Sequence, residues 1–324
     1  MHLKKLILTA MMVCCAFINA QTCCSGGIPL SNNIGMSIEE KGTFQLSVNY
    51  DYNNLNTLNN GTENLNDDSR LRITHSVLLN TSYAITNSLS IEALFTWVNQ
   101  RRKITQFGNE NLDQTSGIGD GLALLKYSFE NLIGKNSDIT LGLGAKIPFG
   151  SSTETNTQGI TLNADLQPGS NAWDAIYFIS ASKNPSFRPT LTIATRLIYR
   201  GTGTNPSYFG DQTYKFGNEL QAFLTFTDQF LAFKTLISPS ISFKYRDADL
   251  DQIDGFDLDN TGGNWVFLIP NFSINIAPNL MFLTRAELPI YSNVDGTQLT
   301  PTYRLMSGLL LKLKPKEKLF NIKQ

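Results

Sequence analysis

Hydrophobic and polar residues alternate along much of this chain. Between residues 191 and 200 the odd-numbered positions are mostly apolar, whereas the even-numbered positions include Arg196 and Arg200. A period of two is typical of an extended strand, because successive side chains point to opposite faces. The pattern fits a soluble sheet with its polar face in water, and it equally fits a membrane barrel with its polar face in a lumen. Other features must decide which medium lies on the apolar side.

About twelve segments, each roughly 9 to 15 residues long, show this period. They are centred on residues 42–51, 70–83, 88–102, 119–129, 137–148, 173–182, 188–201, 212–226, 229–246, 263–276, 279–292 and 301–313. Such lengths match tilted strands that cross a bilayer, and they exceed the usual strand of a soluble sheet.

The connections between these segments alternate in length. Tight turns are predicted at residues 84–87, at Asp228 and at residues 277–278. Long polar connections are predicted at residues 53–69, 103–117, 150–172, 201–211, 247–262 and 293–300. Outer-membrane barrels combine short periplasmic turns with longer extracellular loops in this way. The sequence therefore predicts an all-β protein, an antiparallel transmembrane β-barrel of about twelve strands over residues 42–313, of the outer-membrane type.

The first twenty residues have the layout of a secretory signal peptide. Lys4 and Lys5 precede an apolar run, and small residues stand near Ala20. A buried N-terminal helix is the alternative interpretation. After residue 21 no apolar run is long enough for a transmembrane helix, so an exported chain that enters a membrane must do so as a closed barrel. We expect residues 1–20 to be cleaved and the protein to reach the outer membrane of a Gram-negative bacterium.

Two further segments flank the predicted barrel. Residues 21–41 are long enough to form a small plug inside it, and disorder is the alternative. Cys23 and Cys24 can form a vicinal disulfide in an oxidising periplasm. Residues 314–324 are predicted to be a basic periplasmic tail, because an even number of strands places both ends of the barrel on the same side.

Charged residues on the polar parity of the strands are expected to face the lumen. An unpaired charge facing lipid at mid-membrane would cost about 2–4 kcal/mol. The residues predicted to line the lumen or the solute path are Glu92, Lys126, Lys146, Arg196, Arg200, Lys215, Glu219, Lys234, Lys244, Arg285, Glu287 and Arg304. They form either a structural network that fills a narrow barrel or the wall of a permeation path. In the second case their cationic excess favours anionic or polar solutes.

Glycines cluster where two of the long connections meet the strands. Gly117, Gly119 and Gly121 predict a bend or bulge at the rim, and Gly142 and Gly144 predict lumen space for long neighbouring side chains.

Three prolines stand within predicted strands. Each of Pro239, Pro270 and Pro289 removes a ladder hydrogen bond. Bulges near a rim are one interpretation, and a break in the wall through which an apolar solute leaves sideways is the other.

Several motifs carry a resemblance to a known family. The chain reads G-I-G-D-G at 117–121, G-A-K-I-P-F-G at 144–150, Q-P-G-S-N-A-W-D at 167–174 and Y-K-F-G-N-E at 214–219. Together these resemble the outer-membrane proteins of the meta-pathway of phenol degradation family, over roughly residues 115 to 225. The resemblance implies an outer-membrane barrel that acts as a channel or transporter for small hydrophobic or aromatic solutes.

Other function classes have little support. The formal net charge of −1 gives no reason to expect a nucleic-acid partner. The acidic stretch 247–259 resembles a calcium loop, but Gln252 stands where the turn needs glycine and Leu258 where the bidentate acid belongs. It is expected to be a solvated loop that touches lipopolysaccharide through divalent ions. His75 has no obvious serine nucleophile, so the protein is not expected to be an enzyme.

The sequence thus predicts a passive channel for small solutes. A non-conducting structural or adhesive surface protein is the alternative, and a soluble periplasmic β-protein is a third class. No cofactor and no metal site is expected. The expected partners are outer-membrane lipid, lipopolysaccharide and an unidentified solute, and the protein is expected to be a monomer.

Overall fold

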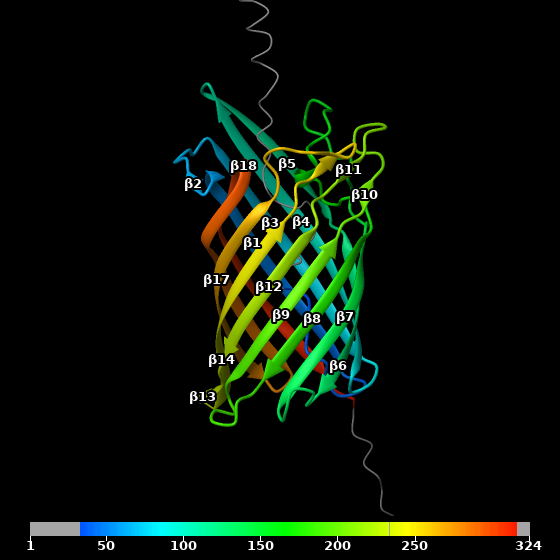
Figure 1. Ribbon diagram of the computed structural model, residues 1–324, viewed down its shortest axis with the longest axis vertical. Coiled ribbons are helices and arrows are strands. Elements are labelled where there is room, and N and C mark those ends of the chain that lie inside the picture. The colour runs from blue at the N-terminus through cyan, green and yellow to red at the C-terminus, as the bar shows by residue number, and fades with distance from the viewer. Residues whose placement is uncertain (1–32, 233, 316–324) are drawn as a thin grey trace, which may run out of the picture.

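Alternate side chains of each strand face opposite sides of a closed wall in the computed structural model, which describes residues 33–232 and 234–315 (Figure 1). Leu197 and Tyr199 are 45% and 42% exposed on the outside, whereas Ile198 and Arg200 are buried within. The predicted parity of this strand is therefore confirmed. The predicted signal peptide, Cys23 and Cys24, and the tail after residue 315 lie outside the described residues.

Eleven strands close the ring in the described part of the chain. They are β1 (Phe44–Gly61), β3 (Arg70–Ala84), β4 (Leu89–Gln106), β6 (Gly121–Glu130), β7 (Ser137–Ile147), β8 (Asp174–Lys183), β9 (Thr192–Gly201), β12 (Glu219–Thr227), β14 (Thr235–Ala248), β17 (Gly263–Ala277) and β18 (Leu280–Leu313). Neighbours in this series pair antiparallel, and β1 pairs with β18 to complete the closure.

The last of these strands crosses the wall twice. Residues 280–294 of β18 pair with β17, and residues 294–313 pair with β1. The two legs also contact each other, since the Thr284 hydroxyl donates to Met306 O at 3.2 Å. Gly296, with φ +76°, lies where the legs reverse direction. The barrel thus has the predicted number of crossings, but the connection predicted to be long at 293–300 is a tight turn.

The hairpin between β12 and β14 turns later than predicted. The short strand β13 (Phe230–Ala232) pairs with β14 in the register that β12 already follows. The Asp228 N–H donates to Pro239 O at 3.1 Å, so the ladder continues through the predicted turn at Asp228. The chain reverses beside Lys234, which has φ +63°. The predicted position of the turn, at Asp228, is therefore wrong, because the Asp228 backbone remains in the ladder.

The connection predicted over 103–117 is an extension of the sheet. Its residues belong to β4 and to β5 (Asn109–Ile118), which pair as a hairpin beyond the rim. On β4, Trp97 pairs with Ile118 of β5 and Leu94 pairs with Leu122 of β6. The β5–β6 side of this pairing therefore holds one extra residue. A Cβ on Gly119 would lie 2.2 Å from Thr96 Oγ1. The predicted bulge in the glycine-rich stretch is therefore confirmed, at Gly119.

The two ends of the barrel differ. The long connections 148–173, 202–218 and 249–262 lie at one end, here called the loop end, which Figure 1 shows at the top. Their short elements are η2 (Ala164–Leu166), β10 (Thr204–Asn205), β11 (Tyr214–Lys215), β15 (Gln252–Ile253) and β16 (Phe256–Asp257), and β2 (Glu63–Asn64) lies between β1 and β3 at the same end. The opposite, turn end holds the start of β1 and the end of β18, where Phe44 pairs with Leu313.

The distribution of polarity is the reverse of that in a soluble protein. Buried polar and charged residues outnumber buried apolar ones, and large apolar side chains are exposed around the outside of the wall. Such a wall suits hydrocarbon outside and a polar interior. The lumen also contains an apolar band, which the sequence analysis did not predict. Its members include Leu78, Leu94, Leu124, Phe178, Phe223, Phe267 and Ile269.

Two of the three prolines predicted to disturb the ladder lie at the seam between β17 and β18, whereas Pro239 on β14 pairs with Phe272 without a register shift. Between β17 and β18 the pairing passes from Leu268 and Leu288 to Asn271 and Arg285, and it skips Pro270. Pro289 pairs with Phe267 next to a register shift. The ladder is therefore interrupted there, whereas exit of a solute through the seam stays a prediction. None of the helices among the described residues has the length and apolarity to span a membrane.

Candidate functional site

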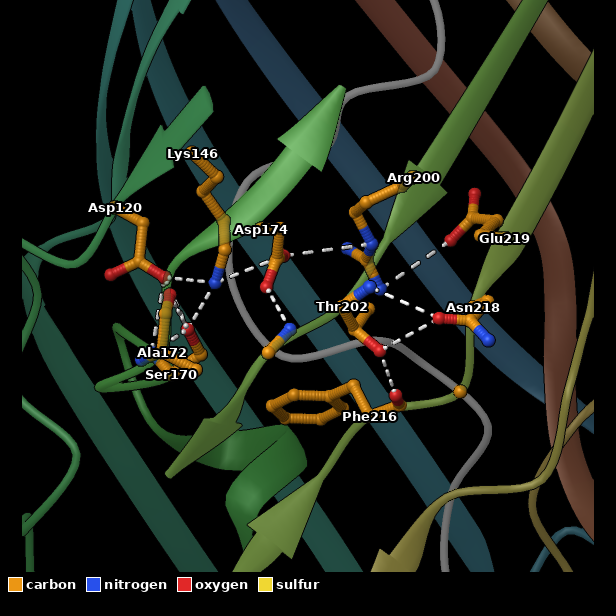
Figure 2. A network of polar contacts seen from close by, with 12 residues as sticks. Asp120, Lys146, Ser170, Ala172, Asp174, Arg200, Thr202, Phe216, Asn218 and Glu219 are labelled. Carbon is orange, nitrogen blue, oxygen red and sulfur yellow. Dashed lines mark hydrogen bonds and ion pairs between the residues drawn. The ribbon is translucent and has the colours of Figure 1, made fainter. Parts of the chain in front are cut away.

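Six inward side chains from neighbouring segments alternate in charge around part of the lumen near the loop end, and Figure 2 labels all of them except Arg246. We call them the charge belt: Asp120, Lys146, Asp174, Arg200, Glu219 and Arg246. Lys146 lies on β7 and faces Asp174 on β8 as a direct cross-strand pair, and Arg200 on β9 faces Glu219 on β12 in the same way. Opposite charges at such positions attract because their side chains leave the same face of the sheet.

The belt is closed around Lys146 by short contacts. Lys146 Nζ lies 2.9 Å from Asp120 Oδ2 and 3.2 Å from Asp174 Oδ2, and it also donates to Ser170 Oγ. The side chains of Lys146, Asp120 and Asp174 are at most 3% exposed. Since removing charges from water is costly, the cation is stable here only because both carboxylates surround it.

The other half of the belt is centred on Glu219. Arg246 Nε lies 3.1 Å from Glu219 Oε1, and Arg200 approaches Glu219 Oε2 at 3.8 Å. The Arg246 guanidinium lies 4.6 Å from the centroid of the Trp265 ring, where a cation–π contact replaces the next carboxylate. The belt thus follows the wall from the Gly119 bulge to β17 with each charge compensated.

The motifs behind the family resemblance meet at one end of this belt. Asp120 belongs to the motif at 117–121, Lys146 and Gly150 belong to the motif at 144–150, and Ser170 belongs to the motif at 167–174. The Ser170 N–H and hydroxyl donate to Asp120 Oδ2 at 3.1 and 2.7 Å. The Gly150 N–H donates to Asp120 Oδ1 at 3.2 Å. These motifs therefore build a structural node that ties connection 148–173 to the wall.

Connection 148–173 folds over the mouth of the lumen, and we call it the cap. A Cβ on Gly169 would lie 2.4 Å from Gly150 O, so the two ends of the cap approach as only glycine permits. Gln167 Nε2 donates to Leu162 O at 2.9 Å and to Glu154 O at 3.0 Å within the cap. Leu166 is fully buried. The cap thus has an interior of its own.

Side chains from the β3–β5 side of the wall hold the cap down. Arg72 NH1 on β3 lies 2.9 Å from Asp165 Oδ2, in the cap helix η2. Gln100 Nε2 on β4 donates to Leu166 O at 3.2 Å, and the Thr115 hydroxyl on β5 donates to the same oxygen. The cap is therefore anchored on both sides of the mouth.

Residues 33–41 enter the barrel from the turn end, and we call them the luminal segment. Glu92 on β4 accepts hydrogen bonds from the N–H groups of Gly35, at 3.0 Å, and Met36, at 3.1 Å. Lys126 Nζ lies 2.6 Å from Glu92 Oε2 and donates to Met36 O. Both side chains of this ion pair are fully buried. The buried Glu92–Lys126 pair thus binds both the N–H groups and a carbonyl group of the segment's backbone.

The luminal segment also fills the apolar band. Ile34 is 2% exposed and packs in the cluster that contains the band's wall residues. Its carbonyl accepts a hydrogen bond from Arg196 NH1 at 3.0 Å. At the turn end, Glu39 Oε1 lies 2.6 Å from Lys312 Nζ. The plug predicted over residues 21–41 can be described only from residue 33 onward, and that part lies in the lumen.

The remaining predicted lumen residues fall into two groups. Lys244 pairs with Glu287 at 2.6 Å, Arg304 pairs with Asp51 at 2.9 Å, and Arg285 also faces inward. Lys215 lies on β11 in the loop-end sheet, and Lys234 is exposed in the turn before β14. Lys215 and Lys234 therefore do not line the lumen. Both lysines were assigned to predicted strands that begin after them in the structure, since β12 begins at Glu219 and β14 at Thr235.

Sequence reasoning missed several of the charged side chains that pair in the lumen. Asp51, Asp174 and Arg246 have the polar parity of their strands, so extending the predicted strands would have found them. Arg72 is likewise an inward position of β3. Asp120 and Asp165 lie outside regular strands, and the motif around Asp120 was its only signal.

The acidic stretch 247–259 holds the loop-end sheet together. Tyr214 OH donates to Asp251 Oδ2 at 2.6 Å, and the Gly217 N–H donates to Asp251 Oδ1 at 2.8 Å. The Thr213 N–H donates to Asp254 Oδ1 at 2.8 Å. Among the described residues no group of three or more His, Cys, Asp or Glu side chains could hold a metal ion. These carboxylates thus act as caps for neighbouring backbone, and their contact with lipopolysaccharide stays a prediction.

Protonation of Asp251 is expected to stabilise this loop-end sheet. Desolvation raises the pKa of Asp251 above its ordinary value of 3.8, although hydrogen bonds from Tyr214 and Gly217 oppose the shift. The folded sheet then binds a proton more tightly than the open one, so its stability is greatest below about pH 3.8 and falls as pH rises through the raised pKa. Hydrogen-exchange protection of the Gly217 amide should therefore fall from about pH 4 to about pH 7. In Asp251→Asn the protection should not change with pH, and an unchanged slope would contradict the assignment.

His75 lies on the outer face of β3. Its Nδ1 lies 2.6 Å from Tyr50 OH, and its ring meets the edge of Tyr52. Ser76 is buried on the opposite, lumen side. The structure thus gives His75 a tyrosine partner in place of a nucleophile.

Comparisons with known proteins bear on the fold. No protein-family model and no curated protein sequence matches this chain. The barrel is similar to the COG4313 outer membrane channel of Pseudomonas putida F1, with a TM-score of 0.67 and 15% identity, over 88% of this chain and 100% of that one. The beta domain of the Bordetella autotransporter BrkA gives a TM-score of 0.48 at 10% identity, over 84% of this chain and 100% of that one.

The first of these similarities extends over nearly the whole described barrel. At 15% identity it shows the fold and leaves the substrate open. Membership of the meta-pathway family stays a prediction, because no family model matches. The chain therefore has the fold of an outer-membrane β-barrel.

Proposed function

We propose that this protein is an outer-membrane channel for small solutes, held closed by its own luminal segment. The observation that carries the proposal is the seal of the apolar band. Ile34 of the luminal segment packs among the wall residues of the band. Residues 33–41 belong to no strand of the ring, so they can leave without opening the barrel.

Apart from the apolar packing of Ile34, the segment is held by polar contacts. Glu92, Lys126 and Arg196 bind its backbone through hydrogen bonds that water can replace. The barrel wall, by contrast, is held by antiparallel strand pairing that closes the ring. A segment with these properties suits a closed state that exchanges with an open one.

One observation favours a non-conducting barrel with a structural or adhesive role. The cap has buried residues of its own at the loop end, and its Asp165 pairs with Arg72 of the wall. A solute that passes the luminal segment must also pass the cap. Measurement of conductance separates the two functions.

The test is to insert the purified full chain into a planar lipid bilayer and to record current in a salt gradient. A channel should give discrete openings, and the reversal potential reports the preferred sign of charge. A channel role is contradicted if no openings occur at any applied voltage, either in the wild type or in a variant whose luminal segment has been displaced.

A further inference from the structure

A cavity of about 310 Å³ lies in the lumen toward the turn end, between β9, β12, β14, β17 and β18. Its walls include Thr227, the last residue of β12, and Met281, near the start of β18. We call it the arginine cavity, because Arg196 and Arg285 both line it. The volume falls at the lower end of the range of small-molecule sites, which is about 300–1,000 Å³.

The charge of this cavity is not balanced by its own lining. None of its lining residues is aspartate or glutamate, and Arg285 donates to Asn33 Oδ1 of the luminal segment. In the described part of the chain, Arg196 has no carboxylate within 4.0 Å, and its NH1 donates to the neutral Ile34 carbonyl. A guanidinium has five N–H donors in a planar fork, which matches the two oxygens of a carboxylate.

Hydroxyl groups extend the polar surface below the arginines. Thr225, Ser240 and Ser242 line the cavity from adjacent strands, and Thr225 Oγ1 lies 2.8 Å from Ser242 Oγ. Asn271 lines the cavity too, and its Nδ2 donates to Ile269 O at 3.0 Å. Neutral donors of this kind bind oxygen atoms of an anion without adding charge.

The rest of the lining is apolar. The Phe223 ring lies 5.6 Å from the Arg196 guanidinium carbon, so the cation rests beside an aromatic ring. Ile269, Met281 and Leu283 complete this surface. A ligand that fits therefore needs a negatively charged end and an apolar body. A small inorganic anion would leave the apolar surface uncovered.

We propose that the arginine cavity is a binding site for small organic carboxylates, with the carboxylate at Arg196 and Arg285 and the apolar body against Phe223. This site would belong to the proposed channel. The idea that the bound carboxylate is a solute in transit rests on that proposed function. Binding itself can be measured without transport.

Isothermal titration of the folded full chain in detergent micelles tests the proposal with benzoate as the probe. Benzamide has the same shape without the charge and should bind at least about tenfold more weakly. Acetate lacks the apolar body and should also bind at least about tenfold more weakly. Inorganic phosphate should bind more weakly than benzoate. Equal affinity for benzoate and either benzamide or phosphate would overturn the proposal, and neither comparison requires a variant.

Variants then place the site. Arg196→Gln and Arg285→Gln should each lower benzoate affinity about tenfold or more. Arg188→Gln is the matched control, because Arg188 lies in an exposed turn-end connection and pairs with Asp228. Unchanged affinity in the Arg196→Gln Arg285→Gln double variant would overturn the proposal. If benzoate binds as expected but bilayers show no current, the proposed channel function fails and the binding site stands. If bilayers show current but benzoate does not bind, the channel function stands and the binding site fails.

Discussion

Replacing Lys146 by methionine is expected to lower the free energy of unfolding by about 3–5 kcal/mol. Lys146 Nζ is the cation between Asp120 and Asp174, at 2.9 and 3.2 Å, and all three side chains are shielded from water. Without the ammonium group, the buried carboxylates of Asp120 and Asp174 lose the positive charge that lies between them. Urea unfolding in micelles, followed by tryptophan fluorescence, measures the change.

Lys103→Met is the matched control for this variant. Lys103 pairs with Glu110 on the β4–β5 hairpin, where the two side chains are 41% and 61% exposed. An exposed pair contributes about 0–1 kcal/mol, so this change should have little effect.

A second substitution tests whether the loss is electrostatic. Asp120→Asn in the Lys146→Met background removes one buried negative charge, and the asparagine oxygen can still accept from Ser170, although the Gly150 N–H then loses its acceptor. The double variant should therefore be more stable than Lys146→Met alone, which a double-mutant cycle quantifies. A double variant less stable than the single one would show that the belt does not act through charge balance.

Replacing Gly35 by valine is expected to raise conductance several-fold, because the luminal segment can no longer occupy its site. Gly35 has φ +92°, which a β-branched residue avoids. A Cβ there would also lie 2.7 Å from the Phe178 ring. The ion pair of Glu92 and Lys126 remains in place, so the wall should keep its stability. Single-channel recording in planar bilayers gives the current per opening and the fraction of time open.

Gly108→Val separates displacement of the segment from backbone strain. Gly108 has φ +77° at the tip of the β4–β5 hairpin, and a Cβ there meets no atom within 4 Å. This variant carries comparable strain without any change in the lumen, so its conductance should equal that of the wild type. Equal conductance in the two variants would mean that displacing the luminal segment does not by itself open the barrel.

The sequence alone determined the wall of this protein. A period of two over segments such as 137–148 and 263–276 gives both the strands and the side of each residue, because pleated backbone sends alternate side chains to opposite faces. The observed strands β7 and β17 agree with these segments within one residue at each end. The bulge at Gly119 also followed from local chemistry, since a glycine cluster at a rim is a local signal.

Only the tertiary structure decided which inward residues meet. Lys126 was predicted to face the lumen, but its pairing with Glu92 depends on the register between β4 and β6, which the bulge shifts by one residue. The same holds for the inward folding of connection 148–173, whose polar sequence suits both solvent and a lumen. The placement of Ile34 and the loss of Lys215 and Lys234 from the lumen are likewise non-local. The physical reason is that side-chain parity is set by each strand alone, whereas contacts across a barrel depend on register and stagger accumulated around the whole ring.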